Sequence, residues 1–119
     1  MFRRMVFNIV ARNNDDHTKN FGFILTDQNK WTLAPAFDVA YSYRPDSIWV
    51  SQSQLSLNGK QDHFTRDDLM TIGRLFNTEA KLIIDEVIDV VSDWQRFAKE
   101  TEVFADLIQL VEANLRLKL

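Results

Sequence analysis

The sequence has 119 residues, about the length of one ordinary domain, and a formal charge of -3 from 14 basic and 17 acidic side chains. It contains no Cys, which excludes disulfide scaffolds, thiolate zinc sites and cysteine nucleophiles, and the lack of a basic excess argues against nucleic-acid binding. Apolar residues make up 45% of the chain, enough for a hydrophobic core, and no apolar run approaches the roughly 20 residues that span a bilayer.

The first predicted element is an amphipathic helix over residues 2–10. Its apolar side chains recur at the spacing of one helix face: Phe2, Met5, Val6, Ile9 and Val10. The polar stretch that starts at Arg12 cuts this apolar segment too short for a signal peptide, and no small-residue cleavage site follows. We therefore expect a cytoplasmic protein of bacterial type that does not enter a membrane.

A β-hairpin is predicted next. Residues 21–26 have the composition of a short strand, Asp27 to Lys30 form a turn, and residues 31–35 return as the second strand. Residues 41–64 are rich in Ser and Gln, contain Pro45 and Gly59, and are expected to be irregular.

Three helices are predicted from residue 65 to the end. Thr65 and Asp68 resemble a capping box, and Thr78 and Thr101 are the predicted caps of the later two helices. Their apolar stripes are expected to be core. These stripes comprise Leu69, Ile72, Leu75 and Phe76; then Ile83, Ile84, Val87, Val91, Trp94 and Ala98; then Phe104, Leu107, Ile108, Val111 and Leu115. The prediction is an α+β fold, mostly α-helical, with one domain over residues 1–119.

The chemistry is expected between residues 12 and 40. Asp15 and Asn20 have the D-x-x-x-x-N spacing of phosphotransferase catalytic loops, and a second acidic residue, Asp38, follows the predicted hairpin. Phosphoryl transfer needs a carboxylate near the attacking hydroxyl and hard oxygen ligands for Mg²⁺. Because the hairpin returns the chain beside the loop, it can bring all three side chains to one place.

These residues resemble the C-terminal domain of HipA-like serine/threonine kinases, the toxins of toxin–antitoxin modules. The resemblance rests on residues 14–23, residues 33–38 and residues 55–60, with weaker matches in the helices, and covers roughly residues 3–98. It implies a segment like the C-lobe of a protein kinase, containing the small β-hairpin, that acts with ATP and Mg²⁺. The resemblance implies that Asp15 corresponds to the catalytic base of the family, and that Asn20 and Asp38 correspond to its magnesium ligands.

Two further loop residues have roles that the resemblance leaves open. His17 lies two positions after the base and either contacts the transferred phosphate or braces the loop, and Lys19 is either a phosphate contact or a solvated charge. The 119 residues contain no counterpart of the phosphate-covering loop or the nucleotide-anchoring Lys of such kinases. We therefore expect the chain to be inactive without a complementary N-lobe.

Other interpretations remain. The chain could be a non-catalytic remnant that binds an antitoxin or a complementary kinase lobe, or a metal-dependent hydrolase using the same acidic cluster. A zinc site from Asp15, Asp16, His17 and Asp38 is conceivable, although there is no second His at helical spacing. The aromatic side chains are expected to serve packing rather than ligand stacking, among them Trp31, Phe37, Trp49 and Trp94.

Overall fold

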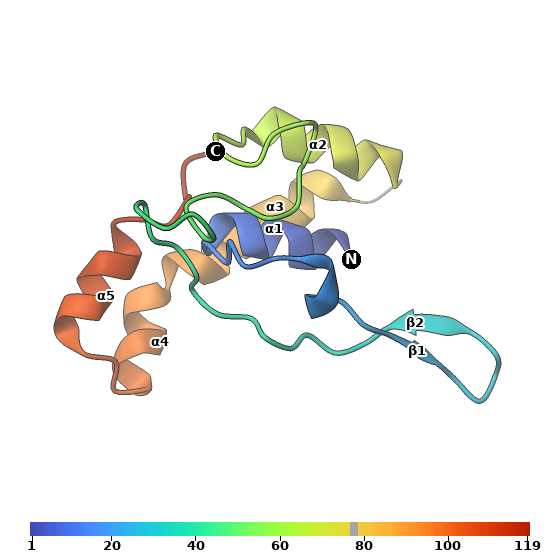
Figure 1. Cartoon of the computed structure of the whole chain (residues 1–119), viewed down its shortest axis with the longest axis horizontal. Helices are drawn as coiled ribbons and strands as arrows, with labels where there is room; N and C mark the ends of the chain where they lie inside the picture. The colour runs from blue at the N-terminus through green and yellow to red at the C-terminus, as the bar shows by residue number, and fades with distance from the viewer. Residues whose placement is uncertain (77–78) are drawn as a thin grey trace.

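The computed structural model describes residues 1–76 and 79–119, and within them the fold is α+β and mostly helical, as predicted (Figure 1). The elements in chain order are α1 (Phe2–Val10), the 3₁₀ helix η1 (Thr18–Asn20), β1 (Phe23–Leu25), β2 (Trp31–Leu33), α2 (Arg66–Leu75), α3 (Ala80–Ser92), α4 (Trp94–Glu100) and α5 (Ala105–Glu112). Thr78, the predicted cap of the second C-terminal helix, lies outside the described residues.

The core forms where α1 packs against α3. The predicted stripe of α1 is largely confirmed: Phe2, Val6, Ile9 and Val10 are buried, and Met5 packs against them. From α3, the buried partners are Ala80, Ile84, Val87 and Val91. Helix α1 is therefore part of the core. The loop that follows its C-terminal end begins at a rigid element.

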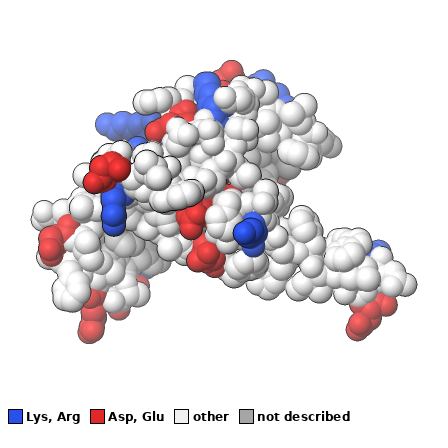
Figure 2. Space-filling model, viewed as in Figure 1, with Lys and Arg blue, Asp and Glu red and all other residues white. Residues whose placement is uncertain are grey.

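The hairpin is confirmed, but it projects away from the body of the molecule (Figure 1). Its strands pair antiparallel, with Phe23 opposite Leu33 and Leu25 opposite Trp31. All three residues of β1 are exposed, and Trp31 is 69% exposed. In Figure 2 the hairpin is largely uncharged except near its tip, whereas the body carries charges of both signs.

The capping box at the start of α2 is confirmed. The Thr65 hydroxyl accepts a hydrogen bond from the Asp68 backbone amide, and the Asp68 carboxylate accepts one from the Thr65 backbone amide at 2.8 Å. Asp68 is buried and also binds Lys60 Nζ at 2.6 Å and the Asn58 side-chain amide at 2.9 Å. These contacts, that of Lys60 foremost, hold the pKa of Asp68 well below its usual range. The irregular segment is thereby tied to α2.

Several predictions for the C-terminal helices were wrong. Leu75 and Phe76 are 74% and 70% exposed, and Phe104 and Leu107 are also exposed, so no element of residues 1–76 or 79–119 covers these side chains. The predicted long helix is interrupted at Asp93, which separates α3 from α4. Thr101 does not cap α5; its hydroxyl instead donates to the Phe97 carbonyl at the end of α4.

Three of the four aromatic residues that were expected to serve packing do not lie in the core. Trp31, Phe37 and Trp49 are exposed. Trp94 is half-buried, and its indole nitrogen donates to the Ile108 carbonyl at 3.0 Å, which ties α4 to α5. No helix in the described part of the chain is long and apolar enough to cross a membrane.

Gly73 marks the close approach of α2 to the start of α3. Replacing a helical Gly with Ala ordinarily stabilises by about 1 kcal/mol. Here the new Cβ would lie 2.2 Å from Ala80 Cβ and 3.1 Å from the Phe2 ring. Because overpacking costs about 1–3 kcal/mol, Gly73→Ala is expected to lower the free energy of unfolding in urea by about that amount. Arg74→Ala, on the exposed face, is the control, and a raised urea midpoint for Gly73→Ala would refute the steric argument.

Candidate active site

The predicted catalytic loop leaves α1 along a path fixed by buried polar groups. Arg12 has a left-handed backbone (φ 59°), which turns the chain sharply after α1. The Asn13 amide then donates to the Asn8 carbonyl at 2.9 Å, and the Asn13 side chain donates to the Asn8 side chain at 3.2 Å. Asn13 also pairs in parallel with Ser42, far along the irregular segment. The first part of the loop is therefore fixed in the interior rather than lying as a solvated turn.

The structure brings Asp15 and Asn20 together. The Asn20 side-chain nitrogen donates to the Asp15 backbone carbonyl at 2.9 Å, and the Asn20 backbone amide donates to the His17 carbonyl at 3.0 Å within η1. The tight turn of η1 thus closes the loop on itself. Both ends of the predicted motif lie at one site.

The Asp15 carboxylate is accessible to solvent. Its Oδ1 lies 3.7 Å from His17 Nε2, and the two side chains are 47% and 40% exposed. A contact of this length between exposed groups is weak, so it leaves the carboxylate able to accept a proton from another molecule. Lys19 is exposed, and its side chain has no polar partner in the described part of the chain.

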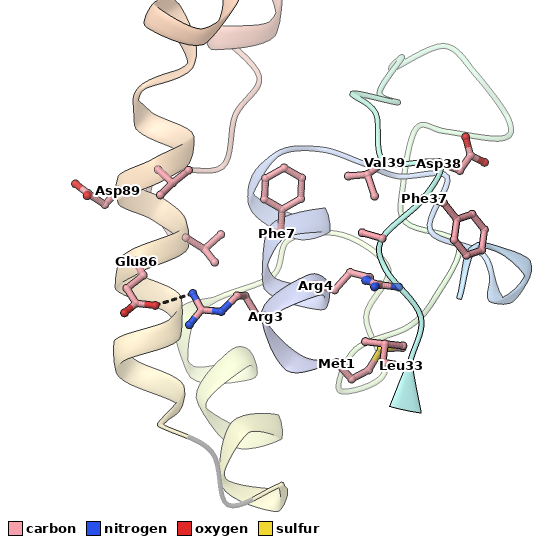
Figure 3. Close-up of a pocket in the computed structure, with 13 residues that line it drawn as sticks. Met1, Arg3, Arg4, Phe7, Leu33, Phe37, Asp38, Val39, Glu86 and Asp89 are labelled. Atoms are coloured by element: carbon pink, nitrogen blue, oxygen red, sulfur yellow. Dashed lines mark hydrogen bonds and ion pairs between the residues drawn. The ribbon is translucent and has the colours of Figure 1, made fainter. Parts of the chain in front are cut away.

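Asp38 lies just beyond β2 with a left-handed backbone (φ 52°), a conformation more easily adopted by Asp and Asn than by most residues. Its side chain is exposed and has no hydrogen bond or ion pair with residues 1–76 or 79–119. In Figure 3 its carboxylate points away from Phe7. The expected approach of Asp38 to Asn20 stays a prediction.

A cavity of about 970 Å³ opens between α1, α3 and the segment that follows β2 (Figure 3). Arg3 closes one side by pairing with Glu86 at 2.6 Å, and Arg4 donates to the Ala34 carbonyl at 2.7 Å. Most of the remaining lining is apolar: Met1, Phe7, Leu33, Ala36, Phe37, Val39, Val87 and Val90. Its size is that of a ligand or partner side-chain site, and Asp38 is among its lining residues.

Sequence reasoning missed the role of Asp16. Its carboxylate is buried, and Oδ1 accepts hydrogen bonds from the backbone amides of Gln54 at 2.7 Å and Leu55 at 3.2 Å. Burial raises the pKa of Asp16, although the bonds from these two amides oppose the shift. No signal in the sequence could have identified contacts with residues almost 40 positions away.

The hypothetical zinc site does not form from its four side chains. Asp16 is turned toward backbone amides, and the described residues contain no group of three or more His, Asp or Glu placed to hold a metal ion. Asn20 and Asp38 offer donors of a different kind. The Asn20 side-chain oxygen accepts no hydrogen bond from the described residues, and the Asp38 carboxylate has no partner among them. Both oxygens are therefore available to bind a metal ion, and Mg²⁺ prefers hard oxygen ligands of this kind.

Comparison with known proteins gives one family. The family described as the HipA-like C-terminal domain matches residues 1–94, which include the loop, the hairpin, Asp38 and helices α1 to α3. No curated protein and no solved structure matches the chain.

Proposed function

The chain belongs to the family of HipA-like C-terminal domains, and from this premise we propose that it is the catalytic-loop and magnesium-binding part of a serine/threonine protein kinase. The proposal treats residues 1–119 as one domain, like the C-lobe of a protein kinase, and as part of the toxin of a toxin–antitoxin module. A cytoplasmic location accords with a role of this kind.

The observation that carries the proposal is the closed loop in which Asn20 binds the Asp15 carbonyl at 2.9 Å. In this arrangement the Asp15 carboxylate orients the substrate hydroxyl and accepts its proton, since it is accessible and has no strong ion pair. His17 lies against Asp15 and braces the loop or contacts the transferred phosphate. Lys19, which is exposed, contacts a phosphate of ATP.

Asn20 and Asp38 are the residues that would hold Mg²⁺. Bound Mg²⁺ would neutralise charge on the nucleotide phosphates. The two side chains supply oxygen donors, and the Asp38 carboxylate has no hydrogen bond or ion pair with the described residues. This supports Asp38 as a ligand, because a carboxylate engaged in an internal ion pair would have to break that pair first.

The nucleotide-covering part has to come from another segment. The three glycines, Gly22, Gly59 and Gly73, stand singly, so the 119 residues contain no glycine-rich phosphate loop. Positioning provides most of the catalysis in phosphoryl transfer. We therefore propose that this chain is inactive until a complementary N-lobe supplies those contacts.

A second function, binding without catalysis, is favoured by the exposed apolar surface of the hairpin and the cavity. Phe23, Ile24, Leu25 and Trp31 are each about half exposed or more, and clusters of this kind mark interaction sites. The partner would be a complementary kinase lobe or an antitoxin. In this interpretation the loop is a remnant whose residues no longer hold a metal.

Binding of Mn²⁺, a paramagnetic substitute for Mg²⁺, separates the two functions. In NMR spectra of the 119-residue chain, substoichiometric Mn²⁺ is expected to broaden the amide signals of Asn20 and Asp38 first, and Asp38→Asn is expected to abolish this preference. Asp27→Asn, in the exposed hairpin turn, is the matched control. Equal broadening at scattered surface carboxylates such as Asp85 would favour the non-catalytic remnant.

A further inference from the structure

We propose that Asp16 is a positioning residue that, together with Asn14, fixes the catalytic loop onto residues 50–55 and so aims Asp15 outward. The inference rests on the proposed function, because it assigns Asp16 a task in placing the catalytic base. It concerns a residue that contacts neither substrate nor metal and acts only through its neighbour.

The first argument is that the exposed side chain of Asp15 lies between two buried ones. Asn14 is fully buried and Asp16 is 7% exposed, whereas the side chain of Asp15 between them is 47% exposed. The side chains on either side of Asp15 are held in the interior, which leaves the Asp15 backbone little freedom to turn. Holding Asn14 and Asp16 inward therefore keeps Asp15 directed toward solvent.

The second argument is what holds these two side chains. The Asn14 side chain donates to the Val50 carbonyl at 3.1 Å, and Asp16 Oδ1 accepts the amides of both Gln54 and Leu55. One oxygen can meet two consecutive amides only while that backbone keeps its conformation. The contacts are thus specific to one arrangement of the two segments.

The third argument is that residues 53–55 are themselves fixed. The Ser53 amide donates to the Gln61 carbonyl at 2.9 Å, and the Gln61 side chain donates to the carbonyls of Ser53 and Gln54, each at 3.1 Å. Asp16 is therefore anchored to a braced segment rather than to a free loop. It has no ion pair with a described residue, so its buried charge depends on these amides.

Removal of this anchor is expected to mobilise the loop without unfolding the core. Hydrogen exchange on the 119-residue chain measures this directly, at the hydrogen-bonded amides of Asn14, Asn20 and Phe21, with core α3 amides such as Ile84 as reference. Asp16→Ala is expected to speed exchange at the loop amides about tenfold and leave Ile84 nearly unchanged. Asp16→Asn keeps an acceptor oxygen and is expected to restore part of the protection, while Asp46→Ala, at an exposed site, is the control.

Two exchange patterns would overturn the proposal. One is acceleration of exchange confined to the amides of Gln54 and Leu55. The other is uniform acceleration that includes Ile84, which would indicate a merely structural role.

The second experiment measures phosphate transfer by the chain combined with a complementary N-lobe. There, Asp16→Ala is expected to lower kcat about 100-fold with little change in KM, because a small displacement of a catalytic group is enough to cost that much.

The two experiments distinguish failure of this inference from failure of the proposed function. An active wild-type assembly with an unchanged kcat in Asp16→Ala contradicts the positioning role. A wild-type assembly that transfers no phosphate contradicts the kinase function, and the exchange pattern alone then decides whether Asp16 fixes the loop.

Discussion

Asp15→Ala is expected to lower phosphate transfer by the chain and its complementary lobe about 10²–10⁴-fold, the usual contribution of a general base. Nucleotide affinity is expected to change little, since a base acts mainly in the transition state. The side chain is half-exposed and makes only a 3.7 Å contact with His17, so the fold should not depend on it. Initial rates and nucleotide titrations on the same preparation measure the two effects.

Asn20→Ala is the informative comparison for Asp15→Ala. It removes a proposed metal-ligand oxygen and also the hydrogen bond to the Asp15 carbonyl, so it is expected to weaken metal-dependent nucleotide binding as well as the rate. If the loop were only a surface turn, both variants would be nearly silent and would change stability by no more than about 0.5 kcal/mol. Wild-type rates in both variants would remove this loop from the active site.

Asp38→Asn is expected to abolish phosphate transfer while leaving the fold intact. Asn tolerates the left-handed backbone found at this position (φ 52°), so the change removes the charge without straining the chain. The Asp38 carboxylate has no partner among the described residues. The free energy of unfolding of the Asp38→Asn variant should therefore differ from that of the wild type by no more than about 0.5 kcal/mol. Full activity with a normal thermal transition would exclude Asp38 as a metal ligand.

The parts of the fold that local patterns determine could be predicted from the sequence. The stripe of α1, the hairpin and the Thr65–Asp68 capping box each depend on residues within a few positions of one another. The same periodicity misplaced Leu75, Phe76 and Phe104 in the core. An apolar spacing shows that one face of a helix is apolar, but it does not show whether another element covers that face.

Only part of the candidate site could be predicted from the sequence in the same way. The Asp15–Asn20 spacing predicted that the two residues act at one site, and they do lie together: the turn at Thr18–Asn20 lets the Asn20 side chain reach the Asp15 carbonyl. Their catalytic roles stay a prediction. The inward anchoring of Asn14 and Asp16 could not be predicted, since their partners Val50, Gln54 and Leu55 lie more than 30 positions away. The proximity of Asp38 to Asn20 was predicted from the hairpin, and its test is the metal-binding experiment.

Transfer of radiolabelled phosphate from ATP tests the central claim most directly. The 119-residue chain is assayed with Mg²⁺ and a protein acceptor, alone and together with a complementary N-lobe. We expect no transfer by either part alone, because this chain contains no glycine-rich phosphate loop, and clear transfer by the two together that Asp15→Ala removes. Absence of transfer when the two parts form a stable complex, or equal transfer by the Asp15→Ala variant, would contradict the assignment of this domain as the catalytic part of a kinase.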